Sequence, residues 1–403
     1  MSKYFFCSSL NDIKKSDWNE CVGNDHPFLQ YEFLHALEES KSANTKTGWQ
    51  PYHYIEKEND KVISLCPLYI KNHSFGEYIF DHSWADAYHR YGINYYPKLQ
   101  SAIPFTPVTG DRIVLNKSIK DKKKKQVQVI KNIIEEAKKI NVSSLHFNFV
   151  NDASNWHDVE NIMIRSGIQF HWNNNEYKKF DDFLNDLSSR KRKIIRRERQ
   201  CIEKNNLQVK LLNGDDIKEE HISFFYDCYL DTTGRKWGAT YLTKEFFFEI
   251  LDNFKNNILL IMAFQEDKMV ASAINFISKT HLYGRLWGSK YEVPFLHFEL
   301  CYYQAIEYAI RNNIKIVEAG AQGEHKLQRG YVPTKTWSTH WIKDQEFSKA
   351  IQKFLDNESQ LIDNQKERLD DFLPFKNEAS SFLTSCLFEN SKLIFLSLLV
   401  IST

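Results

Sequence analysis

Residues 282–331 combine side chains that exchange protons with side chains that hold anions. An apolar run at 314–319 leads into Gly320-Ala321-Gln322-Gly323-Glu324-His325-Lys326. Small residues directly after a strand let backbone amides approach a ligand. Glu and His donate and accept protons, whereas Lys and Arg bind anions. This stretch is therefore predicted to hold the active site.

Formation of an amide by direct attack of an amine needs a proton acceptor and hydrogen-bond donors for the developing oxyanion. Backbone amides beyond Glu318 are candidates for those donors. A single Glu or His in a loop is also explained as a structural hydrogen-bonding residue. Glu318 lies in an apolar run, where burial demands a partner, and a Glu–Arg pair would satisfy it equally well. The candidate acid–base residues are Glu324, His325, His297, Glu299 and Glu318.

Cations and indole rings in the same half of the chain suit substrate binding. Arg holds a phosphate or carboxylate through two parallel hydrogen bonds, and Trp stacks on bases or sugars. The tryptophans are equally explained as core residues. The predicted binding residues here are Arg235, Trp237, Arg285, Trp287, Gln322, Gly323, Lys326 and Arg329.

A basic segment, LSSRKRKIIRRERQ at 187–200, is the second candidate binding surface. Ser188 or Ser189 can cap a helix there. Seven cations in ten residues repel one another, and only Glu198 offsets them. We therefore predict that the helix binds an anion (a diphosphate, a nucleotide tail or an RNA backbone), and the alternative is a solvated face. The cations are Arg190, Lys191, Arg192, Lys193, Arg196, Arg197 and Arg199.

An aromatic-rich segment at 76–110 shows little regular periodicity and contains His82, Trp84 and Asp86. Long irregular segments inside compact domains often bind ligands. The segment is predicted to be either a binding loop or an aromatic loop packed over the first domain's core.

Length and composition narrow the class of protein. A chain of 403 residues exceeds the usual size of a single core, so about two domains are expected. Lys and Arg number 53 and Asp and Glu 52, so no overall basic field favours DNA. The seven cysteines are scattered without Cys-x-x-Cys, which suits neither a zinc site nor a disulfide framework. We expect no metal site and a cytoplasmic protein.

The C-terminal run at 393–401 is strongly apolar. Crossing a bilayer takes about 20 apolar residues, so a packed final element is favoured. A peripheral contact with a membrane surface and a true span are the two alternatives.

Hydrophobic periodicity predicts a mixed α/β fold. Hairpins are expected at 52–70 and 258–277, strands at 144–150, 281–287 and 314–319, and a turn at 234–238. Helices are expected at 120–139, 155–166, 221–233, 242–254 and 347–372. Each half has a meander, a helix and an apolar strand, which indicates duplicated architecture. The expected division is 1–172, 173–345, and a helical extension with an apolar tail at 346–403.

Eight stretches together resemble the FemAB-like branch of the GNAT acyltransferases, in particular the bacterial family labelled peptidoglycan biosynthesis/recognition. They are HPFLQYEFLHALEES (26–40), HSWADAYHRYG (82–92), AIPFTPVTGDR (102–112), LSSRKRKIIRRER (187–199), TTGRKWGATYLT (232–243), LYGRLWG (282–288), LHFELCYYQAIEYAI (296–310) and EAGAQGEHKLQRGYVP (318–333). The resemblance implies two tandem GNAT-like domains, with the active cleft between or within them. It also implies transfer of an acyl or aminoacyl group to an amine, in some relatives from aminoacyl-tRNA to a lipid-linked cell-wall precursor.

The donor stays open at this point. Gln322-Gly323 and Arg329-Gly330 only approximate the family's pyrophosphate loop, so acyl-CoA, aminoacyl-tRNA and another activated acyl carrier are all compatible. No permanently bound cofactor is expected. The main hypothesis is an N-acyltransferase, and the alternative is a non-catalytic module that binds a phosphorylated envelope precursor or RNA through the basic helix. A cleft joining that helix to Glu324 and His325 would favour the enzyme.

Overall fold

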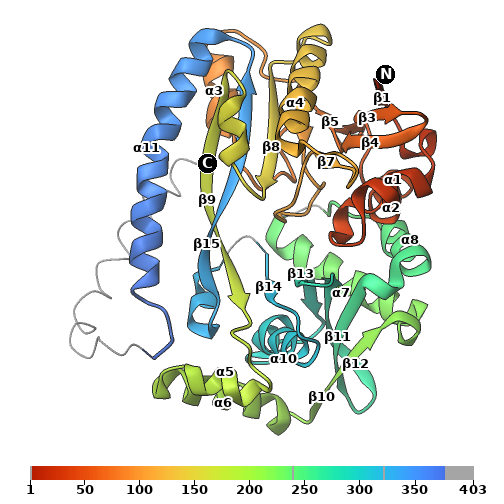
Figure 1. The fold of residues 1–403 in the computed structure, drawn as a ribbon. Helices are drawn as coiled ribbons and strands as arrows, with labels where there is room; N and C mark the ends of the chain where they lie inside the picture. Colours follow the sequence, from red (N-terminus) through yellow and green to blue (C-terminus); the bar gives the residue numbers. More distant parts are fainter. Residues whose placement is uncertain (1, 238–239, 321–322, 377–403) are drawn as a thin grey trace.

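An eleven-stranded mixed sheet runs through the molecule (Figure 1). The computed structural model describes residues 2–237, 240–320 and 323–376. The strands are, in spatial order, β10 (Leu207–Asn213), β11 (Ile258–Gln265), β12 (Lys268–Ile277), β13 (His281–Ser289), β14 (Ile316–Glu318), β9 (Ile162–Asn173), β15 (Val332–Ile342), β8 (Ser144–Val150), β6 (Lys98–Ser101), β5 (Tyr69–Lys71) and β2 (Trp49–Pro51). The pairs β13–β14 and β6–β8 are parallel, and the other neighbours are antiparallel. A smaller sheet holds β1 (Lys3–Cys7), β3 (His53–Glu58), β4 (Lys61–Cys66) and β7 (Val114–Leu115).

Helices cover the sheets on both faces. They are α1 (Lys15–Val22), α2 (Tyr31–Glu39), α3 (His82–Arg90), α4 (Lys122–Lys139), α5 (Phe180–Asp186), α6 (Ser189–Lys204), α7 (Glu219–Trp237), α8 (Lys244–Phe254), α9 (Leu296–Phe298), α10 (Gln304–Arg311) and α11 (Gln345–Asp370). A π-helical turn, Glu299–Tyr303, joins α9 to α10. Short 3-10 turns are η1 (Leu10–Asp12), η2 (Pro27–Leu29), η3 (Ser154–Asp158), η4 (Gly214–Asp216), η5 (Lys255–Asn257) and η7 (Glu324–Arg329).

Helix α4 forms where the sequence alternates a basic face with an apolar stripe. The Asp121 side chain accepts a hydrogen bond from the Lys124 backbone nitrogen and caps the first turn, at 3.0 Å. The apolar stripe is buried against β8, and the lysines at 122–124 face solvent, whereas Lys125 turns inward and pairs with the buried Glu56. The buried residues of the helix are Val129, Ile130, Ile133, Ile134 and Ala137.

The first forty residues pack against the second half of the chain. The Phe28 ring lies 5.0 Å from that of Phe276 on β12, and the Phe33 ring lies 5.5 Å from that of Phe246 on α8. Edge-on aromatic contacts of this kind add stabilisation beyond the buried area. The two halves therefore share one core.

Strand β15 lies between β9 and β8, so the last strand of the second half completes the sheet of the first (Figure 1). Helix α11, which begins at a cap made by Asp344, lies along β9 and β15. A bidentate ion pair, Arg165 Nε and Nη2 with Glu358, fixes α11 to β9 at 2.7 Å for each bond. Sheet hydrogen bonds between β9 and β14 cross the predicted division near residue 172. The division stays a prediction.

Most of the predicted elements are confirmed, including both hairpins, α4, β8 and α11. Three predictions were wrong. Residues 76–110 are not irregular throughout, because α3 buries Trp84 and Tyr88 one turn apart. The helix expected at 155–166 is instead η3 and the start of β9, which gains strand partners only in the folded protein. The turn expected at 234–238 begins as the last turn of α7, which continues to Trp237.

No helix within the described part of the chain is both long and apolar enough to cross a bilayer. The apolar run at 393–401 lies outside the described residues.

Candidate active site

Strands β13 and β14 pair over three residues and then separate. Their last matched pair is Tyr283 with Glu318, after which β13 continues to Ser289 while β14 ends. Gly320 follows in a left-handed conformation, at φ 82°, which glycine adopts without a steric penalty. We call this separation the notch. At the notch, the end of the predicted 314–319 strand lies beside the part of β13 that carries Arg285 and Trp287.

Four polar side chains gather at the notch, although they come from separate parts of the chain. Arg285 Nη2 lies 3.5 Å from Glu318 Oε2, and Lys326 Nζ donates to the carbonyl oxygen of Gly320 at 2.8 Å. His171 is the residue of β9 that pairs with Glu318. Glu318 and Lys326 are each only 2% exposed. A buried polar cluster thus forms directly beneath the loop that the sequence singled out.

Burial determines the protonation state of this cluster. Removal from water, together with the nearby Arg285 cation, lowers the pKa of the Lys326 amine to about 7. Burial also raises the pKa of Glu318, and Arg285 opposes that shift. A neutral amine is therefore available near neutral pH, next to an arginine.

Glu318 has the buried partner that its place in an apolar strand requires. Besides Arg285, the Thr109 hydroxyl donates to Glu318 Oε1 at 3.5 Å from the first half of the chain. The ion pair accounts for Glu318 structurally, so of the two explanations open at the sequence level the paired carboxylate is the simpler.

Several buried histidines are held neutral, and of these His171 and His26 lie near Arg285 of the cluster. Burial lowers the pKa of His171 to about 4, and of His26 and His146 to about 3. These values lie below the ordinary value of about 6.5 for an unfolded chain, so the unfolded state binds more protons below that pH. Their contribution to stability is present above pH 6.5 and is lost as the pH falls toward 3.

Acidification is therefore expected to destabilise the protein from pH 6.5 downward. Thermal unfolding followed at half-unit steps from pH 7.5 to 4 should show the midpoint falling steadily over this range. A midpoint that stays constant down to pH 4.5 would contradict burial of neutral histidines.

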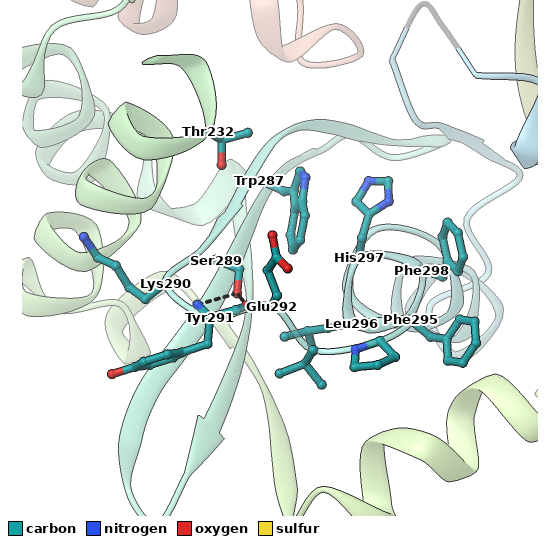
Figure 2. A pocket seen from close by; sticks show the side chains of 12 residues that line it. Thr232, Trp287, Ser289, Lys290, Tyr291, Glu292, Phe295, Leu296, His297 and Phe298 are labelled. Carbon is teal, nitrogen blue, oxygen red and sulfur yellow. Dashed lines mark hydrogen bonds between the residues drawn. The ribbon is translucent and has the colours of Figure 1, made fainter. Parts of the chain in front are cut away.

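A pocket of about 610 Å³ opens beside the notch (Figure 2). It lies where β13 leads through a turn into α9, and Trp287, two residues beyond Arg285, forms one wall. His297 and Phe298 form the opposite wall, and the Trp287 and His297 rings are 4.7 Å apart. The remaining lining residues are Thr232, Ser289, Lys290, Tyr291, Glu292, Val293, Pro294, Phe295 and Leu296.

His325 lies behind this wall. Its Nε2 is 2.8 Å from the Tyr302 hydroxyl, and its ring is 6.0 Å from that of His297. Tyr302 belongs to the π-helical turn, which widens the helix by one residue and presents the tyrosine toward η7. The structure thus brings together the predicted residues His297 and His325. The side chain of Glu324 and the residue Gln322 lie outside the described part of the structure.

Arg329 ties this wall to the basic helix. Its guanidinium lies 3.4 Å from the centre of the Phe298 ring, and Nη2 is 2.8 Å from Glu198 Oε1 on α6. The Tyr303 hydroxyl donates to the same carboxylate. Arg329 is 7% exposed, so its charge is neutralised within the protein rather than by solvent.

Glu299 is held in the same way. Arg199 Nη2 lies 3.0 Å from Glu299 and 2.9 Å from Glu307, and Gln304 donates to Glu299 at 2.7 Å. Burial nevertheless raises the pKa of Glu299. Both Glu198 and Glu299 therefore dock α6 onto the site.

The outer face of α6 keeps its cations in solvent. Arg196 pairs with Asp181 at 3.2 Å, and Arg192 donates to Asn185 at 2.9 Å. Within the described residues, no ion pair or side-chain hydrogen bond is made by Arg190, Lys193 or Arg197, which are exposed. The basic helix is therefore positioned against η7, with an uncompensated positive face.

Other predicted residues lie elsewhere. Trp84 is buried between Arg165 on β9 and His340 on β15, and His82 and Asp86 are exposed on α3. The side chains of Arg235 and Trp237 are not among those described. Sequence reasoning missed His171 and Thr109, since neither stands near the 320–326 loop in the chain. Strand pairing places His171 there, and packing of the first half of the chain places Thr109 there.

A family model for FemAB-like proteins of peptidoglycan biosynthesis/recognition matches residues 9–377. The chain belongs to this family. Membership confirms the resemblance found in the sequence. No curated protein matches the chain significantly.

Two solved structures with TM-scores above 0.5 confirm the mixed α/β fold of this FemAB-like protein. The crystal structure of FemX is 11% identical, covers 84% of this chain and 98% of its own, and gives a TM-score of 0.53. The C-terminal domain of a putative lysylphosphatidylglycerol synthetase from Agrobacterium fabrum is 8% identical. The match covers 83% of this chain and 95% of that domain, with a TM-score of 0.51. A tandem GNAT protein from the clavulanic acid biosynthesis pathway is 8% identical and matches with a TM-score of 0.43. The match covers 84% of this chain and 98% of that protein.

Proposed function

We propose that this FemAB-like protein transfers an acyl or aminoacyl group from an activated carrier to an amine, within the synthesis of a cell-envelope precursor. The observation that carries the proposal is Lys326, a buried amine with a pKa lowered to about 7 at the notch. Membership of the peptidoglycan biosynthesis/recognition family supports an envelope acceptor. The shared fold with FemX supports a transferase rather than a passive binder only by analogy.

In the proposed reaction, the nitrogen of the acceptor amine attacks the carbonyl carbon of an ester or thioester. A C–N bond forms, the C–O or C–S bond to the carrier breaks, and the carrier leaves with the electron pair. Neutral Lys326 takes the proton from the attacking nitrogen, because its lowered pKa leaves it unprotonated near neutral pH. The ammonium that forms then protonates the leaving group.

Arg285 is the proposed donor to the oxyanion. Its Nε is buried and has no hydrogen-bond acceptor within the described residues, while Nη2 is directed to Glu318. A preorganised cation at a site that excludes water stabilises developing negative charge strongly. Gly320 keeps side-chain bulk away from the same point.

The carrier is proposed to lie along α6. The exposed cations Arg190, Lys193 and Arg197 would contact the carrier on the outer face of the helix, and Glu198–Arg329 connects that helix to the pocket wall. Such a face attracts a polyphosphate or an RNA backbone. This observation also fits the second candidate function, a recognition module for a phosphorylated envelope precursor or RNA.

The deciding experiment offers the purified protein acetyl-CoA, a long-chain acyl-CoA and charged tRNA, each with candidate amines, and detects products by mass spectrometry. Donor-dependent acylation of any amine is expected and would identify the donor class. Binding of RNA or a lipid-linked diphosphate, without transfer from any donor, would instead establish the recognition module.

A further inference from the structure

The pocket of Figure 2 has aromatic walls and one uncompensated carboxylate. The side chain of Glu292 points into the space between the Trp287 indole and the His297 imidazole. Phe298 continues the wall beyond His297, with ring centroids 5.6 Å apart. Glu292 makes no hydrogen bond or ion pair with any residue that the structure describes.

The one lysine of the lining does not neutralise this acid. Figure 2 shows the Lys290 ammonium directed away from the space between Trp287 and His297. Lys290 is close enough to Cys228 on α7 for its charge to act on the pKa of that thiol. Among the side chains that the structure describes, Arg329 and Arg199 also lie beside the pocket, and they are paired with Glu198 and Glu299.

A carboxylate and several ring faces around one space suit a particular kind of ligand. Aromatic rings attract cations through their negative faces, and a carboxylate adds direct charge attraction. Phosphate and carboxylate ligands are disfavoured, because Glu292 repels them.

We propose that this pocket is a subsite for a primary ammonium group of a substrate, with Glu292 as its specificity-determining counter-ion. The proposal rests on the proposed transferase function. Two sources share this chemistry, namely the amino group of an aminoacyl donor and a second amine of the acceptor. In either case Glu292 positions the substrate and takes no part in the bond changes at the notch.

The test measures binding of two matched probes by ligand-observed NMR. L-alanine methyl ester carries an ammonium beside an ester, and methyl propionate has the same skeleton without the ammonium. The first is expected to bind and the second is not. Glu292→Gln should weaken the first about fivefold, because it removes the charge that pairs with the ammonium and leaves the rings in place. Glu292→Asp should restore most of it.

Glu266→Gln, an exposed acid in the β11–β12 turn, is the matched control and should leave probe binding unchanged. Equal binding of both probes, no binding of either, or no effect of Glu292→Gln would overturn the subsite.

Where transfer activity is found, alanine methyl ester acting competitively against the donor assigns the ammonium to the donor. Competition against the acceptor assigns it to the acceptor. Transfer without any dependence on Glu292 would refute the subsite and leave the transferase proposal standing. Probe binding that depends on Glu292, without transfer from any donor, would keep the subsite and refute the transferase proposal.

Discussion

Lys326→Met is expected to lower kcat about 10²–10⁴-fold while leaving ligand binding near the wild-type level, because loss of a general base removes that much of the rate. The wild-type kcat/KM should rise with pH through about 7, where the buried amine loses its proton. The measurement is a pH–rate profile of both proteins with the donor identified by mass spectrometry. Lys315→Met, an exposed lysine just before β14, is the control.

The same substitution has a consequence for stability that does not depend on activity. The folded pKa of Lys326 lies below the unfolded value of about 10.5, so the unfolded state binds more protons between pH 7 and 10.5. Wild-type stability should therefore gain from each rise in pH within that range. Lys326→Met should remove this contribution, as urea midpoints at pH 7 and 9.5 would show. In the activity assay, retained turnover of Lys326→Met with an unchanged pH–rate profile would contradict Lys326 as the base. His325 would then take that role.

Glu198→Ala is expected to destabilise the protein by about 3–5 kcal/mol, the usual cost of leaving one partner of a buried ion pair alone. The partner is Arg329, which is 7% exposed and keeps its charge in the variant. The Tyr303 hydroxyl would lose its acceptor as well. Urea denaturation at pH 7 measures the change in the free energy of unfolding.

Glu203→Ala, an exposed acid one turn further along α6, is the matched control and should change stability by less than about 0.5 kcal/mol. A second variant separates the charge from the packing. Glu198→Ala combined with Arg329→Met removes both charges and should recover much of the loss. Equal destabilisation by the single and double variants would mean that the loss does not come from the unpaired charge of Arg329.

Local pattern was sufficient for many parts of the fold. The apolar stripe of α4 repeats at the helical period, and two mainly apolar runs flank the polar turn of the β11–β12 hairpin, so each was predicted within a few residues. The stretch around Lys326 was also identified from residue type alone, since strand, small residues and charged groups follow one another there. Its chemistry was assigned differently, as anion binding.

Tertiary structure decided what the sequence left open. Residues 162–166 form a strand because β15 pairs with them. The local sequence cannot indicate such a partner, since Trp337 to Trp341 lie far away in the chain. His171 and Thr109 reach the notch through the same long-range pairing and packing.

The sequence by itself determined the family, the mixed α/β fold, the basic face of α6 and the region of the site, since each depends on residue type and local period. Only the folded protein decided the protonation state of Lys326, the pairing of Glu318, Glu299 and Arg329, and the open carboxylate of Glu292. The physical reason is that a pKa or an ion pair depends on burial and on neighbours within a few ångströms. Those neighbours come from segments that are distant in the chain.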